Sequence, residues 1–332
     1  MRRRDLLAGA SALGVTSALA PLGGRAWAQT VEKYPSRPIR FICPTPAGGV
    51  YDLMARVLAD KIAPALGTIV IENRAGGNAT VGVTAAANSP ADGYTILLGS
   101  NSTHIFQPTM MRHPPYDPVK DFVPIATLSA SWSCVAVSPS LGIKTLKELA
   151  DYAKKNPGKL THGIRGVGDI SYMGGELFKK LAGNPTIVNV PYSAMATAVK
   201  DLISGDLKMT VPLTTPTVTG LHDTGKIRVL AINGPKRLAF APTIPTAVES
   251  GFPDMLAAEY FYLFAPAGTP LPILQRLNEA TGAALQDKGF QDRMTKVGFD
   301  TVFAGGLDAS RAKFMSERER WVPIAQATGV KI

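Results

Sequence analysis

The sequence contains little of what metal sites, disulfide-rich folds and nucleophilic enzymes require. Its 332 residues include two cysteines and four histidines. No C-x-x-C occurs, and the histidines form neither H-E-x-x-H nor a pair four residues apart, so the usual spacing of a zinc site is missing. A G-x-S-x-G elbow and a G-x-x-x-x-G-K-[ST] phosphate loop are also absent. These absences argue against an enzyme, and we expect no cofactor and no metal.

The sequence also lacks the charge patterns of nucleic-acid-binding proteins. Its formal net charge is +10, yet it has no block of five like charges and no arginine–aromatic interleaving. We therefore expect no nucleic-acid partner, although a basic surface mildly favours anionic ones. A hydrophobic content of 45% with 18% charged residues is typical of a globular protein. Beyond residues 1–28, no segment is apolar enough to cross a bilayer.

Residues 1–28 have the parts of an export signal. A run of three arginines starts at Arg2, residues 6–22 are mostly apolar, and Ala26-Trp27-Ala28 fits a cleavage site. We therefore expect a periplasmic protein that is cleaved after Ala28. The adjacent arginines also fit a twin-arginine signal, and a general secretory signal stays the alternative. Cys43 and Cys134 fall in strands predicted to be buried, which favours two free thiols, although export would permit a disulfide.

Short apolar strands alternate with helices along the rest of the chain, which is typical of doubly wound α/β folds. We expect two such lobes with a ligand cleft between them: residues 29–130 with 258–332 form lobe 1, and residues 131–257 form lobe 2. The predicted strands are 39–43, 68–72, 94–98, 133–137, 159–162, 186–190, 207–211, 227–232 and 260–264. The predicted helices are 52–63, 79–88, 145–155, 172–181, one that ends near 203, 272–288 and 310–326.

Two loops at the carboxyl ends of the first and third strands form one side of the expected cleft. Parallel sheets bind ligands at that edge. In the first loop, glycines let the backbone turn sharply, and the following helix directs its N–H groups at the loop, which suits a small anion. A tight βα connection without a ligand is the structural alternative. The candidate residues here are Thr45, Ala47, Gly48, Tyr51, Asp52, Asn101, Ser102 and Thr103.

A second glycine-rich loop, at 163–171, would face the first from lobe 2. Arg165 can bind a carboxylate through two parallel hydrogen bonds, or it is a solvated surface arginine. Asp169 can pair with Arg165, receive a ligand amine or hydroxyl, or act only as a helix N-cap. The remaining candidates in this lobe are Gly166, Val167, Gly168, Ser171 and Ser193.

Motifs along most of the chain resemble those of the Bug receptors, the TctC-type extracytoplasmic substrate-binding receptors of tripartite tricarboxylate transporters. The first is P-x-P-A-G-G-x-x-D at 44–52, and the last is A-P-A-G-T-P at 265–270. Others lie between them in order, at 70–77, 92–94, 115–122, 155–159, 175–178, 190–192 and 245–251. The second loop departs from the family pattern, because Ile164-Arg165 stands where serines are usual and Tyr172 where histidine is usual.

The resemblance implies a type II periplasmic binding protein, a monomer that closes its two lobes on a small organic acid. It also implies a partner, a membrane permease with a large and a small subunit. In the family, the loops matching 44–52 and 163–171 hold a carboxylate largely through backbone groups and water. Because of the departure in the second loop, we expect Arg165 to contact the carboxylate directly. An extracytoplasmic sensor for a membrane kinase is the alternative to transport.

Overall fold

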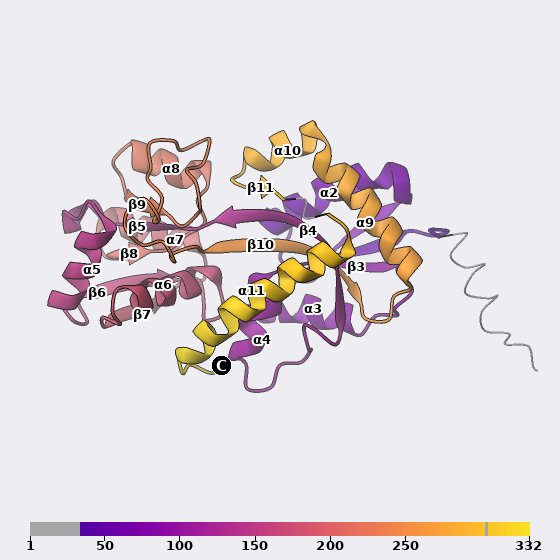
Figure 1. Ribbon diagram of the computed structural model, residues 1–332, viewed down its shortest axis with the longest axis horizontal. Helices are drawn as coiled ribbons and strands as arrows, with labels where there is room; N and C mark the ends of the chain where they lie inside the picture. Colours follow the sequence, from indigo (N-terminus) through magenta and orange to yellow (C-terminus); the bar gives the residue numbers. More distant parts are fainter. Residues whose placement is uncertain (1–33, 303–304) are drawn as a thin grey trace, which may run out of the picture.

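The computed structural model describes residues 34–302 and 305–332, and Figure 1 shows two groups of elements joined by long strands. The predicted export signal and its cleavage site after Ala28 lie outside the described residues. Among the helices that are described, none is both long and apolar enough to cross a membrane. We call the group around the six-stranded sheet lobe 1 and the group around the five-stranded sheet lobe 2.

Lobe 1 is built on a mixed sheet with strand order β11-β4-β10-β3-β1-β2. The three N-terminal strands are confirmed and run parallel, and Phe41 of β1 pairs with Ile71 of β2 and Ile96 of β3. The sheet is not parallel throughout, because β10 is antiparallel to both β3 and β4. The strands are β1 (Ile39–Cys43), β2 (Ile69–Asn73), β3 (Thr95–Ser100), β4 (Phe122–Trp132), β10 (Ala258–Pro266) and β11 (Asp300–Thr301).

Helices cover both faces of this sheet. Successive side chains of a strand point to opposite faces. Phe41 therefore joins the core beneath α2 and α9, whereas Ile42 joins a second core with α3 and α11. The helical elements of lobe 1 are α2 (Val50–Leu66), η1 (Gly77–Ala79), α3 (Thr80–Ala87), the single π turn η2 (Ser102–Phe106), α4 (Gln107–Met110), α9 (Leu271–Gln286), α10 (Lys288–Thr295) and α11 (Leu307–Ala327).

Lobe 2 has a smaller mixed sheet with strand order β7-β6-β8-β5-β9. Strand β6 is parallel to β7 and β8, whereas β5 is antiparallel to β8 and β9. The strands are β5 (Cys134–Val137), β6 (Leu160–Ile164), β7 (Ile187–Pro191), β8 (Met209–Thr210) and β9 (Arg228–Ile232). The helical elements are η3 (Pro139–Leu141), α5 (Leu146–Lys155), α6 (Ile170–Leu181), α7 (Met195–Ser204) and α8 (Pro216–Asp223).

Two long strands, β4 and β10, lie side by side and lead from lobe 1 into lobe 2 (Figure 1). Beyond their ends, Ser133 Oγ donates to the carbonyl of Ala257 at 2.9 Å and accepts from Asn233 Nδ2 at 2.9 Å. The two crossing segments are therefore tied together where the chain changes lobe. The predicted boundary at 130/131 falls inside β4, and the one at 257/258 falls directly before β10.

The sequence did not predict the strands β4 and β11 or the helices α4, α8 and α10. Pro124 obscures β4, because proline removes a hydrogen-bond donor from a sheet. It is tolerated because β11 pairs only with Ser129 and Ala130 and does not reach Pro124. Both cysteines are buried and unpaired, which confirms the expectation of free thiols. Strand β6 runs to Ile164 and α6 starts at Ile170, so the loop of lobe 2 is shorter than predicted.

Candidate functional site

The first loop, between β1 and α2, is stabilised by hydrogen bonds to the buried side chain of Asp52. This carboxylate is 4% exposed and accepts hydrogen bonds from Gly48 N, Arg56 Nε and Asn73 Nδ2, each at 2.9 Å. The Arg56 hydrogen bond, with those of Gly48 and Asn73, lowers the pKa of Asp52 to about 2. Asn73 also donates to the carbonyl of Thr45 at 3.1 Å. Asp52 therefore accepts a hydrogen bond from the Gly48 N–H, a group of the loop that we had expected to bind a ligand, and it stabilises the conformation of the loop.

The second loop of lobe 1 follows β3 and contains the π turn η2. Ser102 and Thr103 lie on the site side of this turn, and both are almost fully buried. Ser102 donates through N and Oγ to the carboxylate of Glu259, at 3.1 and 2.9 Å. Asn101 points elsewhere, toward the carbonyl of Ala258 and the carboxylate of Glu317. The hydroxyls predicted to meet a ligand are therefore already engaged within lobe 1.

Glu259 of β10 is a buried acid directly behind the site. Tyr51 donates to its Oε1 at 3.3 Å, and the Tyr51 hydroxyl also lies 2.7 Å from Ser100 Oγ. The ring of Tyr51 packs edge-on against Phe261, with centroids 4.8 Å apart. Burial, and then the charge of Asp169, raise the pKa of Glu259 to about 7. No sequence pattern pointed to Glu259, because its partners come from three distant segments of the chain.

On the lobe 2 side, Arg165 and Asp169 form an ion pair. Arg165 Nε donates to Asp169 Oδ2 at 3.0 Å, and Nη2 donates to the same oxygen. Asp169 Oδ1 accepts from Ser171 N at 3.0 Å, so Asp169 is also the N-cap of α6. Burial opposes ionisation of Asp169, but Arg165 and Ser171 bring its pKa below the ordinary value. Two of the open alternatives for Asp169, pairing and capping, are therefore both realised.

A pocket of about 170 Å³ lies where these segments meet, and we call it the cleft pocket. Five predicted residues line it: Thr45, Tyr51, Ser102, Thr103 and Arg165. Neither Gln107 nor any residue of the loop after β2 was among the predicted site residues. The other lining residues are Pro44, Pro46, Ala75, Gly76, Asn78, Ala79 and Gln107. The predicted residues outside the lining are Ala47, Gly48, Asp52, Asn101, Gly166, Val167, Gly168, Asp169, Ser171 and Ser193.

The two lobes touch beside the cleft pocket, at Gly168 and Gln107. Gly168 has φ +82°, and a Cβ placed there would lie 3.0 Å from Gln107 Cγ and 3.2 Å from Gln107 Cα. This position therefore requires glycine both for its left-handed backbone and for the close approach. Gly168 acts as a contact between the lobes in this arrangement of the chain.

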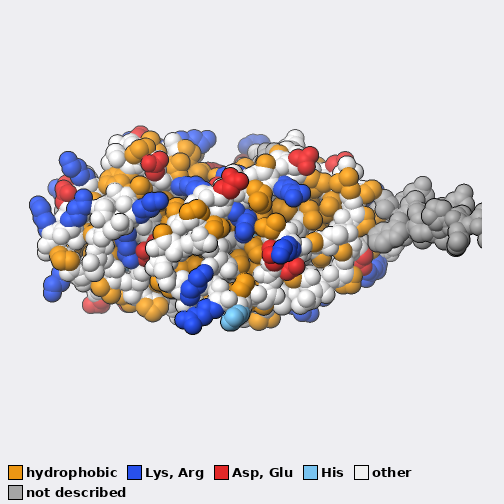
Figure 2. Space-filling view, turned by 60° about the horizontal axis from the view of Figure 1, so that its bottom comes forward, with side chains coloured by type: hydrophobic (Ala, Val, Ile, Leu, Met, Phe, Trp, Pro, Cys, Tyr) orange, Lys and Arg blue, Asp and Glu red, His pale blue; other side chains and the backbone are white. Residues whose placement is uncertain are grey.

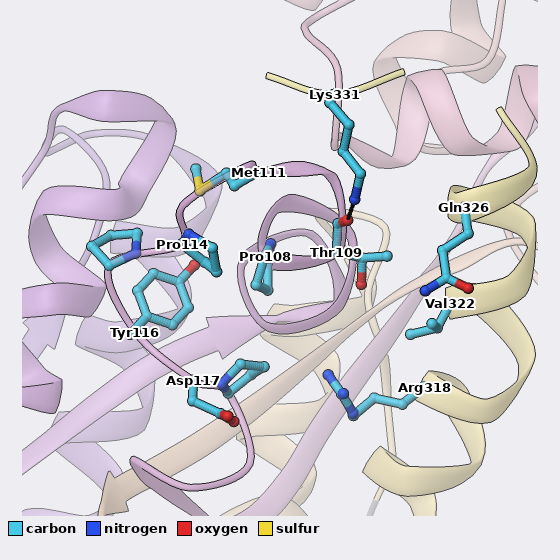
Figure 3. Close-up of a pocket in the computed structure, with 12 residues that line it drawn as sticks. Pro108, Thr109, Met111, Pro114, Tyr116, Asp117, Arg318, Val322, Gln326 and Lys331 are labelled. Carbon is cyan, nitrogen blue, oxygen red and sulfur yellow. Dashed lines mark hydrogen bonds between the residues drawn. The ribbon is translucent and has the colours of Figure 1, made fainter. Parts of the chain in front are cut away.

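A second cavity, of about 600 Å³, also borders α4 but lies against the C-terminal end of the chain (Figure 3). Arg318, Val322 and Gln326 reach it from α11, and Lys331 Nζ donates to the carbonyl of Thr109 at 2.7 Å. None of the residues predicted for ligand binding lines this cavity. It is larger than the cleft pocket but is formed within lobe 1 alone.

The charges on the surface are mixed. Figure 2 shows Lys and Arg side chains scattered over the viewed face, with acidic side chains among them. Over the described ranges, no group of three or more His, Cys, Asp or Glu residues is placed to hold a metal ion. The cleft pocket, in contrast, is lined by loops of lobe 1 together with Arg165 of lobe 2.

Solved structures with this architecture define the class as periplasmic binding proteins. The chain is similar to the periplasmic binding protein BugD, with 30% identity and a TM-score of 0.75 over 90% of this chain and 99% of that one. It is also similar to MatC of Rhodopseudomonas palustris, solved with bound malate, with 28% identity and a TM-score of 0.76 over 88% of this chain and all of that one.

Sequence comparison assigns the family. Residues 54–330 match the model of the tripartite tricarboxylate transporter family receptor, TctC. BugT of Bordetella pertussis is 33% identical over 91% of this chain and 93% of its own length. The chain therefore belongs to the TctC family, as its motifs predicted, and is a solute-binding protein rather than an enzyme.

Proposed function

We propose that the chain captures a small carboxylate in the cleft pocket and holds it by closing lobe 2 onto lobe 1. One observation carries this proposal: Arg165 is the charged residue of the pocket lining, and it reaches in from the lobe opposite to Thr45 and Ser102. An anion placed there would lie between a cation and the polar loops at the ends of β1 and β3. The bound malate of MatC, a relative with the same fold, supports a carboxylate.

Arg165 has hydrogen-bonding capacity left for a ligand. A guanidinium carries five N–H donors, and Arg165 directs only Nε and Nη2 to Asp169. Its Nη1 donates to none of the described residues, and we assign this atom to the ligand carboxylate. Because Asp169 holds the guanidinium in place, the contact costs less side-chain entropy than one made by a mobile arginine.

We also propose how the receptor works in the cell. The mature protein starts at Gln29 in the periplasm, binds its ligand as a monomer and delivers it to a membrane permease with a large and a small subunit. The description of the family as a transporter receptor supports delivery to a transporter. The three parts of the N-terminal signal support export.

A thermal-shift screen of mono-, di- and tricarboxylates, aromatic acids and amino acids tests the capture of a carboxylate. A ligand at about a hundred times its Kd should stabilise the protein by about 2.7 kcal/mol. The absence of a shift with every carboxylate would contradict the proposed function.

The role of Arg165 is tested with the carboxylate that gives the largest shift. Arg165→Ala should weaken its binding by about 10- to 100-fold, because a hydrogen bond to a charged group contributes about 1.5–3 kcal/mol. Arg237→Ala is the matched control, since Arg237 also pairs with an acid in lobe 2, Glu249 at 3.0 Å, but lines neither cavity. Unchanged affinity in Arg165→Ala, measured by calorimetry, would remove Arg165 from the site.

A further inference from the structure

Glu259 is a buried acid that lies one side chain away from the cleft pocket. It is 2% exposed, and its carboxylate accepts hydrogen bonds from Tyr51 and Ser102, which both line the pocket. Over residues 34–302 and 305–332, none of the ion pairs includes Glu259. A buried carboxylate without a cation beside it is costly to ionise. Its protonation therefore responds to any further charge that enters the pocket.

The other titratable groups around Glu259 do not change their charge near pH 7. Strands β3 and β4, which flank β10, carry no titratable side chain. The remaining elements contribute Tyr51 of α2, His104 of η2, Tyr260 and Tyr262 of β10, the Lys313–Glu317 pair of α11, and the Arg165–Asp169 pair of lobe 2. Burial raises the pKa of Tyr51 and Tyr262 and lowers that of His104 to about 3, so these three stay neutral. Each of the two pairs joins an acid to a cation.

Glu259 itself is poised to change its charge near neutrality. Burial, and then the charge of Asp169 across the cleft, bring its pKa to about 7. An anion in the cleft pocket would act in the same direction as Asp169, because a nearby like charge disfavours the ionised form of an acid. Two unit charges about 10 Å apart, at an effective dielectric constant of about 20, change an affinity roughly tenfold. Ionised Glu259 therefore opposes a bound carboxylate, and protonated Glu259 does not.

We propose that Glu259 takes up a proton when a carboxylate enters the cleft pocket, so that the receptor binds its ligand more tightly at acidic than at alkaline pH. This proposal rests on the proposed function, which places the anion in that pocket. It needs no contact between Glu259 and the ligand, because the two charges interact through Tyr51 and Ser102. The coupling is reciprocal: protonation favours binding as much as binding favours protonation.

Calorimetry on the full receptor tests the proposal. The probes are butyrate, benzoate, malate and the tightest-binding acid of the thermal-shift screen, measured from pH 6.5 to 8.5, where their carboxyl groups are ionised. We expect the tightest of them to bind about 5- to 10-fold more weakly at pH 8.5 than at pH 6.5. Measurements at pH 7 in bis-tris and in Tris, two cationic buffers with different enthalpies of ionisation, should show the uptake of about 0.4 proton for each bound acid.

Two variants identify the group that takes up the proton. Glu259→Gln keeps the shape of the side chain without its charge, so it should bind the same acid equally at both pH values and take up no proton. Glu317→Gln is the matched control. Glu317 is also a buried acid of lobe 1, 5% exposed, but it is paired with Lys313 at 2.7 Å and lines neither cavity. This variant should retain both the pH dependence and the proton uptake.

The outcomes separate this proposal from the proposed function. Equal affinity at both pH values, without proton uptake, in the unaltered receptor would overturn the proposal and leave carboxylate capture intact. A pH dependence that survives in Glu259→Gln, or that Glu317→Gln also abolishes, would overturn the assignment to Glu259. If none of the acids binds, both proposals fail. The absence of proton uptake by the unaltered receptor overturns the proposal even if Glu259→Gln does not fold.

Discussion

Replacing Gly168 with alanine tests whether the lobes must approach at this point to bind ligand. Gly168 belongs to lobe 2 and Gln107 to lobe 1, so their contact exists only when the lobes come together. The new Cβ would lie 3.0, 3.2 and 3.3 Å from three atoms of Gln107, two of which are backbone atoms that cannot swing away. The bound, closed form should therefore be disfavoured relative to an open one.

The size of the effect follows from separating backbone strain from the clash. Alanine at φ +82° costs about 1–2 kcal/mol, and this cost is present in both the open and the closed form. Overpacking at a tight contact costs about 1–3 kcal/mol, and it is present only in the closed form. Ligand affinity should thus fall by about 5- to 100-fold, at 1.4 kcal/mol for each factor of ten.

Gly251→Ala supplies the matched control. Gly251 is in lobe 2 with φ +86°, and a Cβ placed there meets nothing within 4 Å. Both variants should lose similar stability in thermal melts without ligand, but only Gly168→Ala should lose affinity in calorimetry with the best carboxylate of the screen. Binding by Gly168→Ala as tight as that of the unaltered receptor would refute the assignment of this contact to the closed form.

Two further predictions concern buried acids and are measured by denaturant unfolding. Asp52→Asn should lower the free energy of unfolding at pH 7 by about 2 kcal/mol, because it removes a charged acceptor. This difference in stability should shrink as pH falls from 4 toward 2, because the pKa of Asp52 is lowered to about 2. Equal stability of the two proteins at pH 7 would contradict the stabilising role of Asp52 in the loop. Glu259 has a raised pKa, so the folded state retains a proton that the unfolded state releases, and its contribution to stability declines as pH rises from 4.5 to about 7. Glu259→Gln should abolish a decline of roughly 3 kcal/mol, and an unchanged pH profile would argue against a buried, protonated Glu259.

The sequence predicted the parts of the fold and site that depend on local patterns. The strand, glycine loop and helix at 39–63 were recognisable because apolar periodicity and turn residues follow one another directly. The glycine-rich loops at 44–52 and 163–171 also predicted Thr45, Tyr51 and Arg165 as site residues, and all three line the cleft pocket.

The rest depends on contacts between distant segments. Asp52 does not line the pocket, and its Oδ1 accepts a hydrogen bond from Asn73, 21 residues later. Gln107 carries no motif, and only the π turn before it and the approach of Gly168 bring it to the pocket. Glu259 is separated from Tyr51 by 208 residues, so their hydrogen bond has no local signal.

The central claim, that a carboxylate is held between the lobes, is tested most directly by a crystal structure of the receptor with the tightest-binding acid of the screen. The account predicts a carboxylate oxygen within hydrogen-bond distance of Arg165, enclosed by Thr45 and Ser102 from lobe 1. A ligand bound instead in the cavity beside Arg318 and Lys331, with the cleft pocket empty, would contradict it.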